Sequence, residues 1–237
     1  MDNLMSYADL FPGGLWFTEK ICADYLHSFK VEEVIFRKRS KFQLIEIVRH
    51  AIFGKMLFLD GRPQVSEFDE WIYHEALVHP AILASEGGKV LILGGGDGGA
   101  LREVLKHGEV EKVVMVELDP DVIEATKEHL SEIHQGAFDD ERVEVVYEDG
   151  WGFIKRGDEK SFDAVIVDVT DPFSGISAKL FTEEFYRDVW RILRKGGALA
   201  TQAESTHFSH LYFGVNFPTI VGTMEHVFGK AYPYAAF

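Results

Sequence analysis

Val90-Leu91-Ile92-Leu93-Gly94-Gly95-Gly96-Asp97-Gly98-Gly99 is the stretch of this 237-residue chain that decides its fold. The apolar residues predict a buried strand, and the glycines then give way to a helical pattern over residues 100–106. A strand, a glycine-rich loop and a helix N-terminus predict a site for a nucleotide-like ligand, because the backbone approaches closely and the helix end offers free N–H groups. Asp97 is unusual there, since a carboxylate repels a phosphate. It indicates a ligand that presents a cation.

Strands and helices alternate after this stretch, which predicts an α/β fold with a parallel sheet and helices on both of its faces. The expected strands cover residues 89–93, 111–118, 142–147, 161–169, 197–202 and 231–237. The expected helices cover residues 120–130, 182–193 and 210–227. Lys195-Gly196-Gly197 resembles a helix stop, and residues 134–140 are the most loop-like stretch.

The residues before this stretch have a different pattern. Residues 1–30 are aromatic-rich, and we expect them to be irregular. Short β-prone runs with a hairpin turn at Asp60-Gly61 predict a small antiparallel sheet. The runs cover residues 31–37, 42–48 and 55–59. We therefore expect an N-terminal β domain over residues 1–69 and a catalytic α/β domain over residues 70–237.

A helix is expected over residues 69–84, directly after the N-terminal sheet. Its expected apolar face consists of Trp71, Ile72, Ala76, Leu77 and Ile82. Proline lacks the backbone N–H that a helix interior needs, so Pro80 is expected to end or bend this helix.

The composition narrows the classes of partner. The formal net charge of −15 argues against nucleic acid and suits a cationic small molecule, although an acidic surface is more often a matter of solubility. A single cysteine, Cys22, allows neither an intrachain disulfide nor a thiolate zinc cluster. The chain shows no signal peptide and no apolar run of about 20 residues, so we expect a cytoplasmic protein without a membrane partner.

Acidic residues follow nearly every expected strand. They are Asp97, Glu117, Asp149, Asp168, Asp171 and Glu204. Because ligands of open α/β sheets lie outside the carboxyl ends of the strands, these acids are expected to share one site. Glu117 lies about twenty residues past the loop, where an acid pairs with ribose hydroxyls. The alternatives are that Asp149 caps the next helix, and that Asp168 and Asp171 form a turn and cap pair. However, acids that close to Asp97 repel one another unless a cation lies between them.

Together these residues resemble the polyamine aminopropyltransferases, the spermidine synthase family, in family order from about residue 40 to the end. The motifs are Leu59-Asp60-Gly61 with Gln64, Asp69-Glu70 with Tyr73-His74-Glu75, Gly94 to Gly99, Glu117, Asp149-Gly150, Asp168-Val169-Thr170-Asp171-Pro172, Leu180 to Tyr186 and Gln202 to Ser205. The resemblance implies a Rossmann-like sheet of the S-adenosylmethionine-dependent methyltransferase type. It also implies transfer of a 3-aminopropyl group from decarboxylated S-adenosylmethionine to a polyamine acceptor, with methylthioadenosine as the second product. The donor would be a co-substrate, with no prosthetic group or metal, and the protein a homodimer or homotetramer.

The resemblance further implies a role for each site residue. The donor-binding residues would be Gln43 and Glu117 on the nucleoside, Asp149 and Gly150 on the adenine, and Asp97 on the aminopropyl ammonium. Asp168 would be the catalytic acid residue that faces the attacking amine, with help from Tyr73. The amine would be held by Gln64, His74, Asp168, Asp171 and Gln202. Asp97 would also repel the carboxylate that ordinary S-adenosylmethionine carries, and so select the decarboxylated donor.

The chain departs from the family pattern in two places. The loop at 173–179 lacks the usual Gly-Pro and lies over the amine site in the family. The segment at 134–140 resembles members from thermophiles and the thermospermine-type branch, so putrescine, agmatine and longer amines all stay open as acceptors. The last family strand is absent. We therefore expect the end of the chain, 231–237, to be disordered, rearranged or paired with another subunit.

Two other functions stay open. A methyltransferase that uses ordinary S-adenosylmethionine shares this fold, although Asp97 and the acids after the fourth strand argue against it. A non-catalytic nucleoside- or polyamine-binding module is the other. A nicotinamide dehydrogenase has less support, because an acid in the loop would repel a pyrophosphate.

Overall fold

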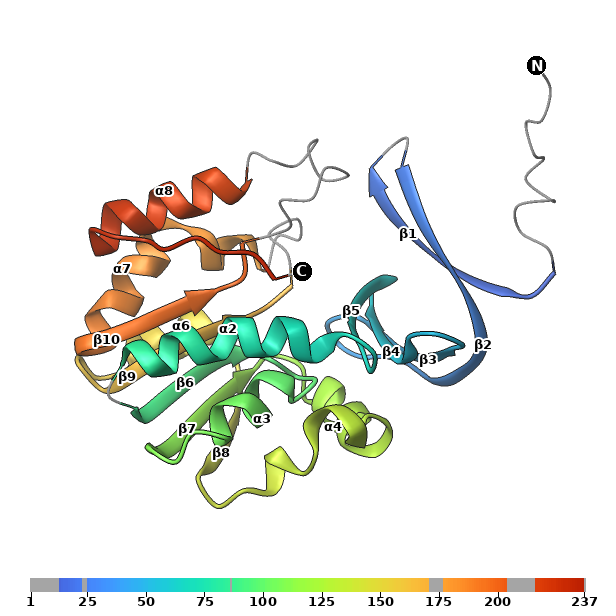
Figure 1. Ribbon diagram of the computed structural model, residues 1–237, viewed down its shortest axis with the longest axis horizontal. Coiled ribbons are helices and arrows are strands. Elements are labelled where there is room, and N and C mark those ends of the chain that lie inside the picture. The colour runs from blue at the N-terminus through green and yellow to red at the C-terminus, as the bar shows by residue number, and fades with distance from the viewer. Residues whose placement is uncertain (1–12, 23–24, 86, 171–176, 204–215, 237) are drawn as a thin grey trace.

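A computed structural model of the chain describes residues 13–22, 25–85, 87–170, 177–203 and 216–236. It contains an N-terminal antiparallel sheet beside a parallel sheet that has helices on both faces (Figure 1). The strand orders are β1-β2-β3-β4-β5 and β10-β9-β6-β7-β8. The predicted α/β class with a small N-terminal antiparallel sheet is confirmed.

The N-terminal sheet is a series of neighbouring antiparallel strands. They are β1 (Leu15–Cys22), β2 (Tyr25–Arg39), β3 (Leu44–His50), β4 (Gly54–Leu59) and β5 (Arg62–Ser66). Asp60 and Gly61 both have positive φ, 49° and 77°, so the predicted two-residue hairpin turn between β4 and β5 is confirmed.

The prediction that residues 1–30 are irregular is wrong for the part that the structure describes. β1 pairs with the first half of β2, with Phe17 opposite Phe29. Both rings pack against Phe58 of β4, at centroid distances of 5.2 and 5.7 Å. The aromatic residues that suggested irregular structure therefore form one apolar face of the sheet.

The strands of the parallel sheet are β6 (Gly88–Gly94), β7 (Val110–Glu117), β8 (Val143–Tyr147), β9 (Phe162–Asp168) and β10 (Leu193–Thr201). These five confirm the predicted strands to within a few residues. In β6, Val90 and Ile92 face one apolar layer, and Leu91 and Leu93 face the other. After β6 the chain adds β7 and β8 on one side of this strand, and then β9 and β10 on its other side. The switch point of the sheet therefore lies beside β6, where α/β proteins bind ligands.

Helices cover both faces of this sheet. They are α2 (Glu70–Ala84), α3 (Gly99–Leu105), α4 (Pro120–His129), α5 (Ser131–His134), α6 (Gly150–Arg156), α7 (Glu183–Ile192) and α8 (Asn216–Phe228). The helices α2 and α3 contribute to one apolar layer, and α6, α7 and α8 contribute to the other. The stretch predicted to be most loop-like contains the end of α5 and the 3-10 turn η1 (Ala137–Asp139), because Phe138 is buried in the first layer. None of the described helices is long and apolar enough to cross a membrane.

Two expectations for α2 are wrong in part. Pro80 does not end this helix, which continues to Ala84. The expected apolar face is also partly wrong, since Trp71 is exposed while Glu70 and His74 are buried. These two polar side chains occupy inward positions because they pair with each other.

Two predictions for the C-terminal part of the chain are also wrong. Lys195-Gly196-Gly197 does not end a helix: α7 ends at Ile192, and these residues lie within β10, where Gly196 has φ +84°. Residues 231–236 form no strand, so the expected sixth strand is wrong. Tyr234 of this segment donates a hydrogen bond to the carbonyl of Ala76 in α2, at 2.6 Å. Among the described strands, β10 forms an edge of the parallel sheet.

Candidate functional site

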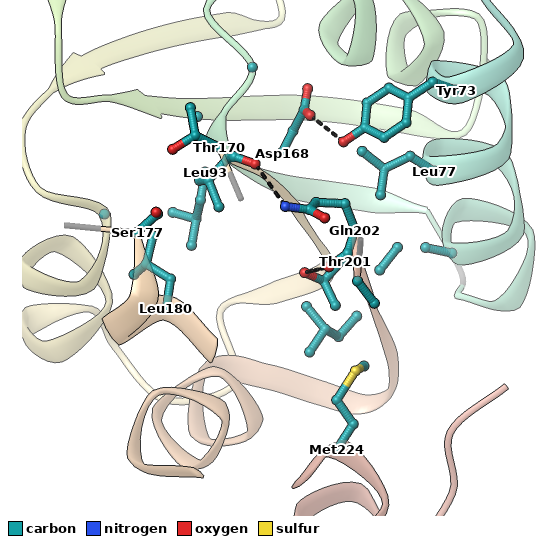
Figure 2. A pocket seen from close by; sticks show the side chains of 18 of the residues that line it. Tyr73, Leu77, Leu93, Asp168, Thr170, Ser177, Leu180, Thr201, Gln202 and Met224 are labelled. Atoms are coloured by element: carbon teal, nitrogen blue, oxygen red, sulfur yellow. Dashed lines mark hydrogen bonds between the residues drawn. The ribbon is translucent and has the colours of Figure 1, made fainter. Parts of the chain in front are cut away.

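A large cavity of about 1880 Å³ lies at the carboxyl ends of β6, β7, β9 and β10 and reaches β4 and β5 of the N-terminal sheet. Figure 2 shows the side chains along part of its wall. The sequence-predicted residues that line the cavity are Gln43, Gln64, Tyr73, Asp97, Glu117, Asp149, Gly150, Asp168 and Gln202. His74 is not a lining residue, and Asp171 and Glu204 lie outside the described residues.

The glycine loop brings the ends of β6 and β9 together. Gly94 has φ +77°, and a Cβ on it would overlap the carbonyl oxygen of Asp168. Gly95 donates its N–H to that same carbonyl at 2.8 Å. Only glycine allows this close approach with a left-handed backbone. Asp97 and Asp168 therefore lie beside each other because the loop packs directly on β9.

Asp97 is held by the start of α3. Its Oδ1 accepts the Gly99 N–H at 2.7 Å, and the side chain is 13% exposed. Burial by itself raises the pKa of this carboxyl, but the charge of His74 and the Gly99 hydrogen bond lower it below its ordinary value. Asp97 is therefore a carboxylate at neutral pH.

Asp168, the last residue of β9, has two unequal oxygens. Its Oδ1 accepts the hydroxyl of Tyr73 at 2.7 Å (Figure 2). Its buried Oδ2 has no hydrogen-bond partner among the described residues. Burial and the charge of Asp97 raise the pKa of Asp168 to about 6. One oxygen is thus fixed by Tyr73, and the other is available to a donor.

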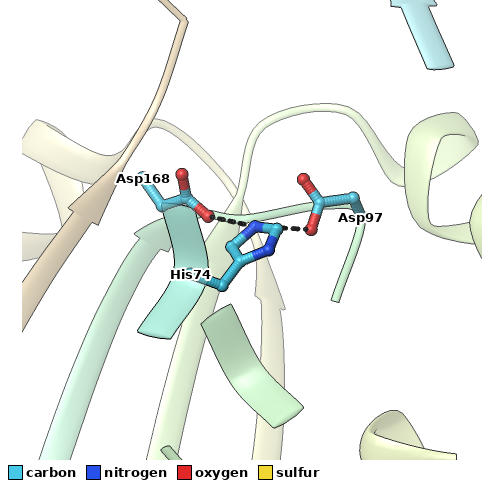
Figure 3. A group of neighbouring side chains, drawn as sticks. All are labelled: His74, Asp97 and Asp168. Carbon is cyan, nitrogen blue, oxygen red and sulfur yellow. Dashed lines mark ion pairs between the residues drawn. The ribbon is translucent and has the colours of Figure 1, made fainter. Parts of the chain in front are cut away.

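The cation expected between these acids is the side chain of His74 (Figure 3). Its Nε2 lies 3.3 Å from Oδ1 of Asp97 and 3.9 Å from Oδ2 of Asp168. Burial by itself lowers the pKa of His74, but the surrounding carboxylates raise it to about 10. The raised pKa makes His74 an imidazolium at neutral pH. Its side chain lies beside the cavity and not at its wall, where an amine-binding residue was expected.

Glu117 and Gln43 both line the cavity, and both are hydrogen-bonded to Asp119. Oε1 of Glu117, at the end of β7, accepts the N–H of Asp119 at 2.9 Å, and burial raises the pKa of Glu117 to about 7. Gln43 donates to Oδ2 of Asp119 at 3.1 Å, as does Ser40 at 2.6 Å. Asp119 joins the N-terminal sheet to the site, and it was not among the site residues predicted from the sequence. Its position just before Pro120, where an N-cap is expected, was the available signal.

Asp149 both caps a helix and lines the cavity. Its Oδ2 accepts the N–H of Gly152 at 3.1 Å, so the capping interpretation is confirmed. Its Oδ1 forms an ion pair with Nζ of Lys179 at 2.8 Å. Gly150 follows at the start of α6, where a Cβ would lie 3.2 Å from Leu93.

The two glutamines predicted to bind the amine lie on different walls. Gln64, on β5, donates to the carbonyl of Arg62 at 3.1 Å. Gln202 follows β10 and donates to the carbonyl of Val169 at 3.2 Å (Figure 2). Both line the cavity, so both add polar groups to its wall.

Gly99→Ala is expected to destabilise the protein by about 1–3 kcal/mol, because overpacking forces neighbours off their preferred positions. A Cβ at Gly99 would overlap the ring of His74. Urea unfolding measures the change. Gly108→Ala is the control, since a Cβ there meets no atom within 4 Å. Equal stability of the two variants would show that His74 does not pack under the loop as described.

Sequence profiles of two families cover this chain. The spermine/spermidine synthase domain matches residues 70–237, and the spermidine synthase tetramerisation domain matches residues 15–67. The polyamine aminopropyltransferase of Aeropyrum pernix is 49% identical over 216 residues, which are 90% of this chain and 68% of that protein. The polyamine aminopropyltransferase of Saccharolobus solfataricus is 43% identical over 231 residues, which are 94% of this chain and 75% of that protein.

Solved structures show the same likeness. A spermidine synthase in complex with the transition-state analogue AdoDATO superposes with a TM-score of 0.84 at 36% identity, covering 90% of this chain and 71% of that one. Spermidine synthase from Thermotoga maritima gives a TM-score of 0.81 at 37% identity, covering 90% and 70%. Together with the profile matches, these likenesses show that the chain belongs to the spermine/spermidine synthase family and is an enzyme of the polyamine aminopropyltransferase class.

Proposed function

We propose that this enzyme transfers the 3-aminopropyl group of decarboxylated S-adenosylmethionine to a polyamine acceptor. The observation that carries the proposal is the pair of carboxylates, Asp97 and Asp168, at the edge of the cavity beside the glycine loop. The substrates of such a transfer are a sulfonium with a terminal ammonium and a polyamine. Two carboxylates that face one cavity match that charge.

The donor side of the cavity suits an adenosyl group. Glu117 pairs with the ribose hydroxyls, and Gln43 holds the nucleoside from the N-terminal sheet. Hydroxyl donors favour the ionised form of a carboxyl, so donor binding is expected to lower the raised pKa of Glu117. Asp149 and Gly150 hold the adenine, and Asp97 accepts the ammonium of the aminopropyl chain.

The acceptor side centres on Asp168. Oδ2, which forms no hydrogen bond within the described part of the chain, accepts an N–H of the attacking amine, while Tyr73 holds Oδ1 and so fixes the direction of the carboxylate. Gln64 and Gln202 hold other parts of the amine from opposite walls. Asp171 belongs to the same proposal on the strength of the sequence motif.

The reaction is a displacement at carbon. The amine lone pair attacks the methylene next to the sulfonium, and a C–N bond forms as the C–S bond breaks. The bond electrons go to sulfur, so methylthioadenosine leaves without the sulfonium charge, and the extra proton of the new secondary amine passes to Asp168. Most of the acceleration is expected from holding the amine in line with the C–S bond. Desolvation in the cavity helps to expose the amine lone pair.

We propose further that the chain acts in the cytoplasm as a homodimer or homotetramer built from two units, residues 1–69 and 70–237. The match of residues 15–67 to a tetramerisation domain supports assembly through the N-terminal sheet. Light scattering of the purified chain measures the oligomer directly, and a monomer at all concentrations would oppose this assignment.

Release of methylthioadenosine tests the function. The chain is incubated with decarboxylated donor and putrescine, agmatine, cadaverine or spermidine in parallel. We expect release with at least one amine, and none with ordinary S-adenosylmethionine. A methylated product from the ordinary donor would instead identify a methyltransferase. Tight donor binding without turnover of any amine would identify a binding module.

A further inference from the structure

His74 lies between carboxylates on both sides of its ring. Its Nδ1 lies 2.7 Å from Oε2 of Glu70, and its Nε2 points to Asp97 and Asp168. The ring is 1% exposed. A neutral imidazole has only one N–H, so it serves carboxylates on one side only. Acids at both nitrogens therefore favour the doubly protonated ring.

Glu70 is in turn held by Arg102 of α3. Nη1 of Arg102 donates to Oε1 at 2.6 Å, and Nη2 donates to Oε2 at 2.9 Å. Nε of the same guanidinium donates to Glu103 at 2.7 Å, so its orientation is fixed. Such a two-bond pair keeps a carboxylate ionised and in place. Burial by itself raises the pKa of Glu70, but His74 and Arg102 lower it below its ordinary value.

We propose that Glu70, clamped by Arg102, is a positioning residue that keeps His74 doubly protonated, with its Nε2–H directed at Asp97 and Asp168. This inference rests on the proposed function, which requires a carboxylate at Asp168. The facing oxygens of the two aspartates and the nitrogen of His74 all lie within 4.8 Å of one another. Two carboxylates at this spacing resist being ionised together unless a cation lies between them.

The groups that face His74 come from every element packed on it. Glu70 and Tyr73 belong to its own helix, and the Tyr73 ring stands edge-on at 5.0 Å. Asp97 comes from the glycine loop and Asp168 from β9. Among these acids in the described structure, Glu70 is the one that does not line the cavity. It therefore acts on the ring without competing with a substrate.

Glu70→Gln removes the charge and keeps the shape of the side chain. We expect the His74 ring to lose its second proton at a pH at least one unit lower than in the wild type. The ring is still protonated near pH 6, so the acid limb of kcat/KM set by Asp168 is expected to stay in place. The alkaline limb is expected to move down by at least one unit, because Asp97 and Asp168 repel each other once the cation between them is lost.

Nitrogen NMR of ¹⁵N-histidine-labelled enzyme measures the ring directly, with the His74 signals assigned from their loss in His74→Gln. The wild type is expected to keep both ring nitrogens protonated to about pH 9, given the raised pKa. Glu75→Gln is the control: this glutamate lies on the same helix, is partly exposed, and has its Oε1 3.9 Å from Nζ of Lys106. It should leave the His74 titration and the pH profile unchanged.

An unchanged His74 titration in Glu70→Gln, or an unmoved alkaline limb, would overturn the inference. Should Glu70→Gln fail to fold, Arg102→Lys keeps the charge but loses the two-bond clamp, and a smaller shift of the same sign is expected. No shift in a folded Arg102→Lys would count equally against it. If the wild type releases no methylthioadenosine, the proposed function fails. The NMR titration still decides whether Glu70 fixes the protonation of His74.

Discussion

Asp168→Asn is expected to lower kcat by about 10²–10⁴-fold while leaving the Kd of the decarboxylated donor within a few-fold of the wild type. Asparagine keeps an oxygen for the Tyr73 hydroxyl, so the local packing should survive. It cannot accept the proton that the attacking amine must lose. Turnover and calorimetric donor binding, measured on the same preparation, separate the two effects. Full turnover by this variant would show that Asp168 is not the catalytic group.

The pH dependence of kcat/KM provides a second test of the role of Asp168. Burial and the charge of Asp97 raise the pKa of Asp168 to about 6, so the carboxylate is lost as the pH falls through 6. The kcat/KM of the wild type should therefore drop about tenfold per pH unit below that point. A bound donor adds an ammonium beside Asp97, which lowers the pKa of Asp168 and moves the limb of kcat to lower pH. Neither limb should remain in the residual activity of Asp168→Asn.

Asp97→Asn is expected to weaken binding of the decarboxylated donor by about 10–100-fold, the equivalent of one hydrogen bond to a charged group. The amide oxygen still accepts the Gly99 N–H, so the loop keeps its anchor. Ordinary S-adenosylmethionine carries a carboxylate at that place, and its binding should change little or improve. The ratio of the two affinities, measured by calorimetry, reports how much discrimination Asp97 provides.

Asp139→Asn is a suitable control for this ratio. Asp139 is exposed and forms a surface ion pair with Lys127 at 3.2 Å, away from the cavity lining. The Asp139→Asn substitution removes one negative charge from the chain and leaves the cavity lining unchanged. An equal loss of donor affinity in both variants would attribute the effect to net charge and not to the position of Asp97.

The fold was predictable because the decisive signals are local. The apolar run before Gly94 and the acids at the strand ends depend on a few neighbouring residues each. The structure places the acids that it describes at one sheet edge, namely Asp97, Glu117, Asp149 and Asp168. The β1–β2 hairpin was not predictable in this way. Its stability depends on Phe17 and Phe29 reaching Phe58, a contact between residues far apart in the sequence.

The candidate site, too, was predictable only where the signals are local. The need for a cation between Asp97 and Asp168 followed from charge repulsion, but the sequence could not show that His74 supplies it. Glu70 and His74 are four residues apart on a helix, a spacing that brings side chains together and was available as a signal. The hydrogen bonds from Arg102 to Glu70 could not be predicted from the sequence, since they require α2 and α3 to pack side by side.

Mass spectrometry of the acceptor amine after incubation with the decarboxylated donor tests the proposed transfer most directly. The acceptor should gain one aminopropyl group, with one methylthioadenosine formed for each product molecule, and Asp168→Asn should form neither at a comparable rate. An acceptor that stays unmodified with every amine offered, or that gains a methyl group instead, would contradict aminopropyl transfer by this enzyme.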